Sequence, residues 1–377
     1  MKALFIYNYF YPAFKAGGPV QSLHNLVKLL ASKLEVNIYT SCFDLNDKLP
    51  LGNVVSDQWV PLVFSKNEDK IQVFYSKKTS FKSVISDRCF ECVYLNGIFG
   101  YEFFLEPFVW AKRNNKRIVI APRGMLQRGA LASKFLKKLI YLKLLKYSGL
   151  LNGVIWHATD NTEAADIEAY VGKGATIEIV PNIPKPPVYT VQNNTKDFFK
   201  LRLVYISLVS EKKNLLTSIE AVIRTKSNVS LDIYGPIKDA DYWNKCLRLI
   251  KENPRRIAYK GDVLPEKVQN VFSLYDASLF LTKGENFGHA LYECLSVGRP
   301  LITSYYTPWN DLKNHKAGWN INIHDSIDAI SQILDSIAAL DAEEFSDYCN
   351  GAHMLAVKHY EELDPMEKYL KLFGNHS

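Results

Sequence analysis

The chain has 377 residues, of which 47% are hydrophobic and 13% aromatic, and its formal net charge is +7. This composition excludes a disordered chain, which is poor in aromatic residues, and a small disulfide-stapled scaffold, because a chain of this length buries a large core. Six scattered cysteines are typical of reduced thiols in a cytosolic protein. No segment approaches the ~20 apolar residues that a membrane-spanning helix needs.

In the first half of the chain, short β-rich runs alternate with segments of helical periodicity. After the opening run, Leu23, Leu26, Val27 and Leu30 recur at helical spacing. The predicted strands of this half cover residues 2–7, 36–40, 92–95, 117–121, 153–158 and 176–180. Alternating strands and helices are typical of a parallel sheet that is covered on both faces.

Residues 183–197 interrupt this order, because they are rich in Pro and Asn and lack apolar periodicity. The alternation then restarts, with predicted strands at 202–206, 229–234, 257–261, 277–281 and 300–304. The sequence therefore predicts two α/β domains, each Rossmann-like, and a ligand at the carboxyl ends of their strands. The expected bounds are 1–186 for the first domain, 187–200 for a linker, 201–355 for the second domain and 356–377 for a helical tail.

The positive charge is concentrated in the first half of the chain. Residues 1–190 hold 24 Lys and Arg against 15 Asp and Glu, whereas residues 191–377 hold 22 against 24. Residues 107–159 hold 11 basic residues and no acidic one, and within them residues 130–153 have the pattern of a basic amphipathic helix. Its candidate membrane-docking lysines are Lys134, Lys137, Lys138, Lys143 and Lys146.

Three interpretations of this basic segment stay open. One is docking on an anionic membrane surface, where each basic residue adds about 1 kcal/mol. The second is a surface helix whose apolar face packs on its own domain. The third is binding to nucleic acid, which no recognisable motif supports.

Gly17 and Gly18 lie in the first loop, just before a predicted helix. Adjacent glycines let the backbone come close to a ligand, and the start of the following helix favours negative charge. A pair of glycines by itself fits a plain turn as well as a binding site.

The strongest local signal is the segment 282–300, TKGENFGHALYECLSVGRP. Glu285 follows a predicted strand, and Glu293 lies about one and a half turns into the next helix. Carboxylates accept hydrogen bonds from hydroxyls, and free N–H groups near Phe287 and Gly288 donate them. The pattern therefore suits a ligand with many hydroxyl groups, although the spacing alone also fits a solvated helix face.

The order of the motifs along the chain resembles that of retaining GT-B glycosyltransferases of family 4. The segment 285–293 has the family pattern ENFG-x4-E, and the G-x-P that the family shows follows it. Further matching segments are the opening strand with its GGP, 120–131, 157–167, 179–183, 210–222 and 307–319. The resemblance implies two Rossmann-like domains facing across a cleft, with the tail crossing back to the first domain.

The resemblance also implies that the second domain binds a nucleotide-diphosphate sugar. In the family, a first glutamate and the backbone after it hold the donor sugar, and the matching residues are Glu285, Asn286, Phe287 and Gly288. A second glutamate binds the nucleotide ribose, and its position here is Glu293.

The implied diphosphate contacts come from both domains. The family has a lysine after the first strand of the second domain, and the matching position is Lys213, with Lys212 beside it. Gly17 and Gly18 would approach the diphosphate or the acceptor from the first domain. His289 is a further candidate for contact with the donor sugar.

Two positions depart from the family pattern. Leu208 stands where the family usually has a diphosphate-binding arginine, and Arg123 stands where many members have a histidine near the reactive carbon. An arginine stays protonated and cannot be a general base. We therefore expect the leaving phosphate to take the acceptor proton on the same face, with retention, while Arg123 and Lys213 stabilise its charge. The candidate catalytic residues are Glu285 and Arg123.

The expected function is a metal-independent glycosyltransferase that moves a sugar from a nucleotide-diphosphate sugar to a glycan or a lipid-linked acceptor. The expected setting is bacterial surface polysaccharide biosynthesis, on the inner face of the cytoplasmic membrane. No metal, cofactor or nucleic-acid partner is expected, since the family that the chain resembles needs no metal. Two alternatives remain: a catalytically degenerate GT-B scaffold subunit, which Leu208 would mark, and a GT-B-like sugar-nucleotide epimerase.

Overall fold

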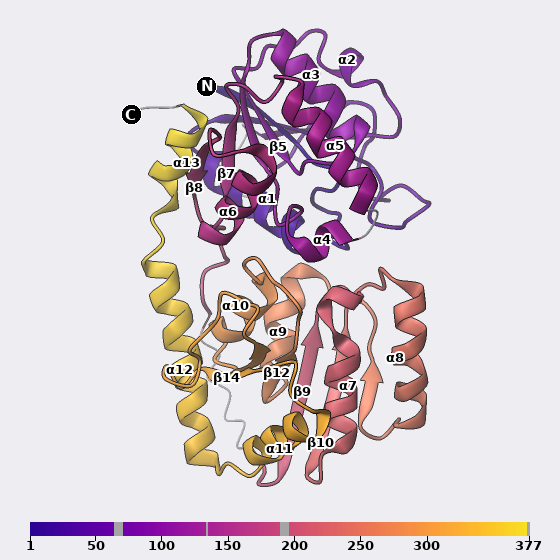
Figure 1. The fold of residues 1–377 in the computed structure, drawn as a ribbon, viewed down its shortest axis with the longest axis vertical. Coiled ribbons are helices and arrows are strands. Elements are labelled where there is room, and N and C mark those ends of the chain that lie inside the picture. Colours follow the sequence, from indigo (N-terminus) through magenta and orange to yellow (C-terminus); the bar gives the residue numbers. More distant parts are fainter. Residues whose placement is uncertain (64–70, 133–134, 189–195, 375–377) are drawn as a thin grey trace. The chain divides into compact units, whose positions relative to one another are not determined.

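The structure is a computed structural model that describes residues 1–63, 71–132, 135–188 and 196–374. The chain forms two compact units, which Figure 1 shows as ribbons. The first contains Met1–Ile183 together with Asp364–Ser377, and the second contains Pro184–Leu363. Part of the linker that we expected over 187–200 lies outside the described residues.

The first unit contains a sheet with the strand order β3-β4-β2-β1-β5-β6-β7-β8. Its strands are β1 (Lys2–Ile6), β2 (Glu35–Ser41), β3 (Trp59–Pro61), β4 (Ile71–Ser76), β5 (Cys92–Asn96), β6 (Arg117–Ala121), β7 (Ile155–Ala158) and β8 (Thr176–Ile179). All neighbouring pairs are parallel except β3 with β4. In the register of this sheet, Phe5 of β1 is opposite Ile38 of β2 and Tyr94 of β5.

Helices cover both faces of this sheet. They are α1 (Gly18–Leu30), α2 (Phe81–Val84), the π-helical turn η1 (Tyr101–Leu105), α3 (Glu106–Arg113), α4 (Arg128–Ala132), α5 (Phe135–Tyr147), α6 (Asn161–Val171) and α13 (Pro365–Phe373). Side chains alternate between the faces of a strand, so Phe5 packs with α1 and α13, while Leu4 packs with α3, α5 and α6. The returning segment starts at Asp364, whereas we placed the start of the tail at residue 356.

The second unit contains a sheet with the order β11-β10-β9-β12-β13-β14. Its strands are β9 (Lys200–Ile206), β10 (Asn228–Tyr234), β11 (Ile257–Tyr259), β12 (Ala277–Phe280), β13 (Leu301–Ser304) and β14 (Gly318–Ile321). All neighbouring pairs are parallel. After β9 the chain first adds strands on one side and then crosses to β12 on the other. The carboxyl ends of β9 and β12 therefore flank a topological switch point, where ligands of such sheets bind.

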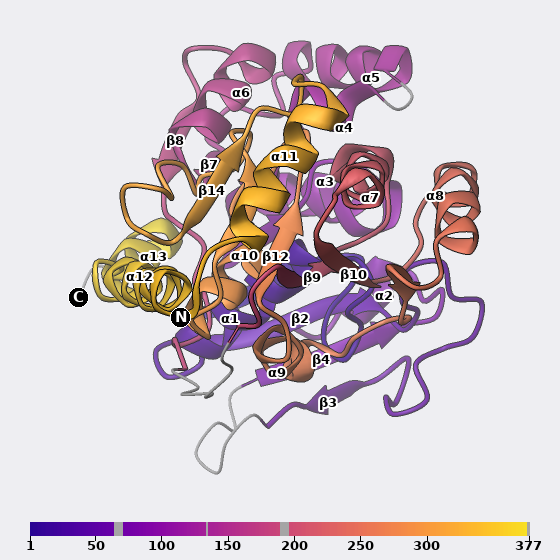
Figure 2. The ribbon, with the colours of Figure 1, turned by 90° about the horizontal axis from the view of Figure 1, so that it is seen from below.

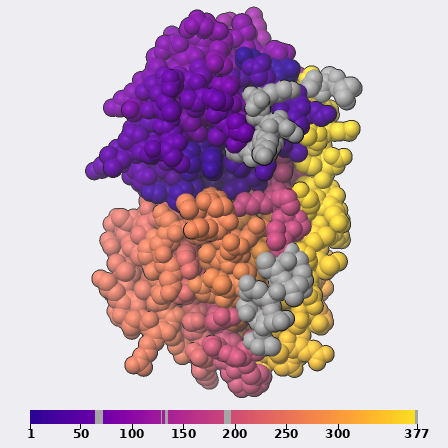
Figure 3. All heavy atoms as spheres, turned by 180° about the vertical axis from the view of Figure 1, so that it is seen from behind, coloured from indigo at the N-terminus to yellow at the C-terminus, as the bar shows by residue number. Residues whose placement is uncertain are grey.

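Two groups of helices sandwich the second sheet. The helical segments are η2 (Glu211–Lys213), α7 (Leu215–Arg224), α8 (Ala240–Glu252), η3 (Pro265–Lys267), α9 (Val268–Ser273), α10 (His289–Ser296), α11 (Ile327–Ala338) and α12 (Ala342–Glu361). Helix α7 contacts α8 and α11, whereas α10 contacts α9 and α12, and Figure 2 shows α7 and α9 on opposite sides of the strands. The outer side of α12 forms part of the surface, in yellow in Figure 3.

The architecture confirms the prediction of two α/β units built on parallel sheets. The sequence reading missed β3, β4 and β14. Strands β3 and β14 have three and four residues, and each is held only by pairing with one neighbour, which local sequence does not reveal. None of the helices in the described part of the chain has the length and apolar character needed to cross a bilayer.

Candidate functional site

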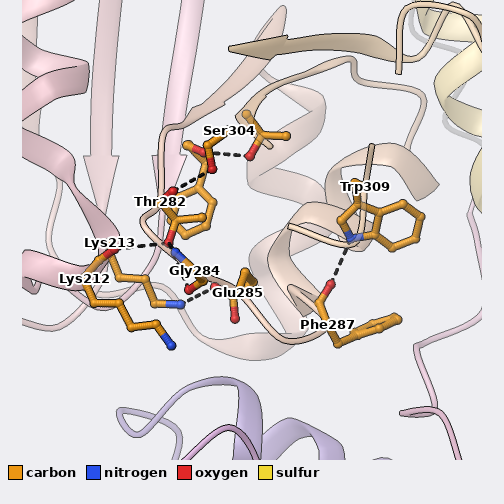
Figure 4. Close-up of polar contacts among 10 residues, drawn as sticks. Lys212, Lys213, Thr282, Gly284, Glu285, Phe287, Ser304 and Trp309 are labelled. Carbon is orange, nitrogen blue, oxygen red and sulfur yellow. Dashed lines mark hydrogen bonds and ion pairs between the residues drawn. The ribbon is translucent and has the colours of Figure 1, made fainter. Parts of the chain in front are cut away.

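The central contact of the candidate site is an ion pair between Lys213 and Glu285, which point toward one another in Figure 4. Lys213 lies in η2, the helical turn that is the next element after β9, and Glu285 lies in the loop after β12. The two residues are 72 positions apart in sequence, but β9 and β12 are neighbours in the sheet. The Nζ atom of Lys213 also lies 5.5 Å from the ring centroid of Phe280. The switch point thus holds a cation and a carboxylate side by side.

Hydrogen bonds to both neighbouring loops fix the loop that carries Glu285. The Thr282 hydroxyl donates to the Lys212 carbonyl at 3.2 Å. On the other side, the Ser304 hydroxyl donates to the Thr282 carbonyl at 2.6 Å, and the Glu285 N–H donates to the Tyr306 carbonyl at 2.9 Å. The position of the Glu285 carboxylate is therefore set by the strand edge, as Figure 4 shows.

Gly288 is the residue that lets this loop turn into α10. Its φ is +76°, a left-handed conformation that favours glycine. A Cβ atom at this position would lie 3.0 Å from Leu291 and 3.1 Å from the Cγ atom of Glu285. The backbone therefore approaches Glu285 closely, at the start of a helix whose first N–H groups lack intrahelical acceptors.

An aromatic cluster supports the start of α10 from within the unit. The Trp309 indole donates from Nε1 to the Phe287 carbonyl at 2.9 Å, a bond drawn in Figure 4. The Phe287 ring also makes edge contacts with Trp309 and His289, with centroid distances of 5.9 and 4.8 Å. His289 is buried, while Asn286 and Lys212 are partly exposed. The rings of Phe287 and His289 lie in this cluster, while the sugar contacts that we expect from the Phe287 backbone and from His289 stay predictions.

Glu293, one turn further along α10, is also paired with a lysine. Its side chain is only 6% exposed, and its Oε1 atom lies 3.0 Å from the Nζ atom of Lys185. Burial raises the pKa of the Glu293 carboxyl, and the charge of Lys185 opposes this effect. Sequence reasoning missed Lys185, because no motif links a residue of the Pro-rich stretch to a glutamate 108 positions away.

The remaining predicted site residues lie in the first unit. Arg123 has a φ of +54° and is buried. Its guanidinium donates to the Asn96 side chain at 2.9 Å, the Asn182 side chain at 2.6 Å and the Tyr94 hydroxyl at 2.6 Å. The buried carboxylate of Glu163 accepts from the Gly124 N–H at 2.6 Å. Arg123 is thus held rigidly at the carboxyl ends of β5 and β6.

The glycine pair caps the first helix of the same unit. Gly17 has a φ of +74° and is the N-cap of α1, and Gly18 is the first residue of that helix. No atom lies within 4 Å of a Cβ atom built at Gly17. The conformation, not crowding, requires glycine there, and the space beside the helix start is open.

The predicted membrane segment is split into α4 and α5, and Lys134 lies outside the described residues. Lys137 and Lys143 are exposed on α5, whereas Lys138 donates to the Ala130 carbonyl at 2.6 Å and Lys146 is partly buried. One set of apolar residues packs on the unit, since Leu142 and Leu145 are buried. A second set is exposed to solvent: Leu136 (71%), Ile140 (58%), Leu144 (68%) and Tyr147 (81%).

Within the described ranges, no group of three or more His, Cys, Asp or Glu side chains could hold a metal ion.

Comparisons with known proteins agree with this arrangement. Residues 192–350 match the model of the family described as Glycosyl transferases group 1, and no curated protein matches the chain. The structure is similar to that of HepE from Anabaena in complex with UDP and glucose, with a TM-score of 0.76 and 13% identity over 100% of both chains. It is also similar to WaaG, a glycosyltransferase involved in lipopolysaccharide biosynthesis, with a TM-score of 0.68 and 14% identity over 100% of both chains.

A third similar structure is sucrose-phosphate synthase from Thermosynechococcus elongatus, with a TM-score of 0.70 and 15% identity over 100% of both chains. Together with the two parallel sheets, these likenesses establish the class of the fold as GT-B, with two Rossmann-like domains. The family match lies in the unit that contains Lys213, Glu285 and Glu293.

Proposed function

We propose that this chain is a glycosyltransferase whose second unit binds a nucleotide-diphosphate sugar. The observation that carries the proposal is the pairing of Lys213 with Glu285 at the switch point of the second sheet. A lysine there offers a charge for a diphosphate, and a carboxylate beside it offers acceptors for sugar hydroxyls. HepE has been crystallised with UDP-glucose, so a uridine nucleotide is the first donor to test.

The proposed reaction is retaining and needs no metal. The bond between the donor phosphate oxygen and the anomeric carbon breaks, and the acceptor oxygen bonds to that carbon on the same face. The proton of the acceptor hydroxyl goes to the leaving phosphate. Glu285 orients the donor sugar, while Lys213 and Arg123 stabilise the developing phosphate charge. Asn286, Gly288 and the start of α10 would supply further donors to the sugar.

The experiment that tests this function is a binding panel of nucleoside diphosphates and their sugars, followed by turnover with glycan acceptors. We expect one base to stabilise the chain by about 2.7 kcal/mol at 100 times its dissociation constant. NMR of the product then reports whether the anomeric configuration is retained. If no nucleotide of the panel binds, the chain is not a glycosyltransferase, and Leu208 marks a degenerate donor site in a scaffold subunit.

We further propose that the acceptor is a growing surface glycan, carried by a lipid at the inner face of the cytoplasmic membrane. The support is the surface of α5, where exposed Leu136, Ile140 and Leu144 follow one another every four residues. Exposed Lys137 and Lys143 flank this stripe. Apolar residues with adjacent lysines suit the interface of an anionic bilayer.

A further inference from the structure

Lys185 is the second residue of the second unit, and its side chain is anchored at two points. Its Nζ atom lies 3.0 Å from the Oε1 atom of Glu293 and donates to the Pro265 carbonyl at 2.7 Å. An ammonium group has three N–H donors, so these two bonds fix its direction. Lys185 is 24% exposed, whereas the Glu293 side chain is 6% exposed. The lysine therefore lies between solvent and a nearly enclosed carboxylate.

Lys185 supplies the charge that offsets the burial of Glu293. An unpaired carboxylate in such surroundings would take up a proton rather than stay ionised. Among the described residues, the elements packed against α10 bring Gln269 from α9 and His353 and His359 from α12. Lys185 is within ion-pair distance of the Glu293 carboxylate, and its charge lowers the pKa of that carboxyl.

We propose that Lys185 is a positioning residue for nucleotide binding, which occupies one carboxylate oxygen of Glu293 so that the other is directed at the ribose hydroxyls. This inference rests on the proposed function, in which Glu293 binds the nucleotide ribose. The geometry supports it in two ways. The Oε1 atom carries the ion pair, and the ammonium group that holds it is itself anchored on the Pro265 carbonyl.

The test measures the binding of UDP and of 2′,3′-dideoxy-UDP by calorimetry, for the full chain and for Lys185→Met. Methionine keeps the side chain as far as the Cε atom and removes the charged ammonium group. We expect the dissociation constant of UDP to rise at least tenfold at neutral pH, while that of the dideoxy analogue changes less than twofold. A protein that only lost packing at this position would weaken both ligands equally.

A pH series gives a second readout. Without Lys185, the carboxyl of Glu293 stays protonated to higher pH, so the UDP binding curve of Lys185→Met shifts to higher pH than that of the wild type. Lys185→Arg keeps the charge and should restore the wild-type curve. Lys267→Met, at an exposed lysine two residues after Pro265, is the matched control and should bind UDP as the wild type does.

The possible failures are distinguishable. If Lys185→Met and Lys185→Arg bind UDP with the wild-type affinity and pH profile while Glu293→Gln is impaired, the role of Lys185 is overturned and the proposed function stands. The same conclusion follows if Lys185→Met weakens both nucleotides alike. If the wild-type chain binds neither UDP nor any other nucleoside diphosphate, the proposed function itself fails. Should Lys185→Met not fold, Lys185→Gln takes its place in the same comparison.

Discussion

At the scale of single residues, the second unit pairs each of its two candidate donor-binding carboxylates with a lysine. Lys213 faces Glu285 in the loop region after β9 and β12, and Lys185 faces Glu293 on α10. Each carboxylate is thereby held in one direction before any ligand is present. Such preorganisation lowers the cost of ordering side chains when a ligand binds.

The charge of Lys213 gives the first prediction. Lys213→Ala should weaken the binding of the nucleoside diphosphate by about 10- to 100-fold, because hydrogen bonds to charged groups contribute roughly 1.5–3 kcal/mol. The corresponding nucleoside, which lacks phosphates, should bind both proteins alike. Lys283→Ala is the matched control, since Lys283 is exposed on the same loop region. Equal diphosphate affinity of Lys213→Ala and the wild type would contradict the proposed phosphate contact.

The burial of Glu293 gives a prediction about stability. Burial is the largest influence on this carboxyl and raises its pKa, so ionisation is less favourable in the folded than in the unfolded chain. The stability that the group contributes is present below its unfolded pKa and is lost as pH rises through the raised folded pKa. We therefore expect Glu293→Gln to gain stability relative to the wild type as the pH rises from about 4 towards neutrality, because the wild type must then ionise a buried carboxyl.

Urea unfolding of both proteins across that pH range measures this difference. Glu266→Gln, at an exposed glutamate of η3, serves as the control. Glu293→Gln should at the same time bind the nucleotide more weakly. A stability difference for Glu293→Gln that is constant across the range would show that the ionised carboxylate costs the fold nothing.

At the scale of elements, α5 is a helix that leaves much of its apolar surface exposed to solvent. Only Leu142 and Leu145 of its apolar residues are buried, and the stripe of Leu136, Ile140 and Leu144 faces solvent. Scattered exposed apolar residues are normal, but three at one helical spacing form a continuous apolar surface. This surface lies in the most basic part of the chain.

Vesicle binding tests the role of this surface. The wild-type chain should float with vesicles that contain anionic lipid and remain unbound with zwitterionic ones. Replacing Lys137 and Lys143 by Gln should remove about 2 kcal/mol of attraction, or roughly a 30-fold loss in affinity. Serines in place of the three apolar residues should abolish flotation.

The control for this experiment removes exposed apolar residues elsewhere. Leu274→Ser combined with Met354→Ser changes two exposed side chains of the second unit and should leave flotation unchanged. Binding that also survives in the α5 variants would favour the interpretation of α5 as an ordinary surface helix.

At the scale of the whole molecule, the C-terminal segment completes the core of the first unit. Tyr369, Leu372 and Phe373 of α13 are fully buried, and the Phe373 ring lies 5.3 Å from Phe5 and 5.6 Å from Tyr94. The Tyr369 hydroxyl donates to the Pro181 carbonyl at 3.0 Å. The same unit thus depends on residues from both ends of the sequence.

Phe373→Ala should therefore destabilise the first unit by about 3–5 kcal/mol, the usual cost of truncating a buried phenylalanine. Lys368→Ala, at an exposed position of the same helix, should be neutral. Chemical denaturation followed by circular dichroism measures both. A decrease of less than about 1 kcal/mol in the free energy of unfolding for Phe373→Ala would mean that α13 is not part of the core of the first unit.

The sequence by itself determined the two α/β units, most of their strands but not β4, and the loop that carries Glu285. These features follow from local periodicity and from residue types at fixed spacing. The short strands β3 and β14 were missed, since their stability comes from pairing with a neighbour and not from their own composition. The sequence could not predict that the apolar stripe of α5 is exposed to solvent. A helical pattern shows which residues share a face of the helix, but not whether another element covers that face.

Only the tertiary structure decided which charges meet. Lys213 and Glu285 come together because β9 and β12 are adjacent in the sheet. The order of strands in a sheet cannot be predicted from local sequence patterns. Lys185 reaches Glu293 across 108 positions of sequence, and α13 returns to the first unit after the whole of the second. Local sequence favours most of the elements, whereas contacts between distant residues depend on how those elements pack to bury their apolar faces.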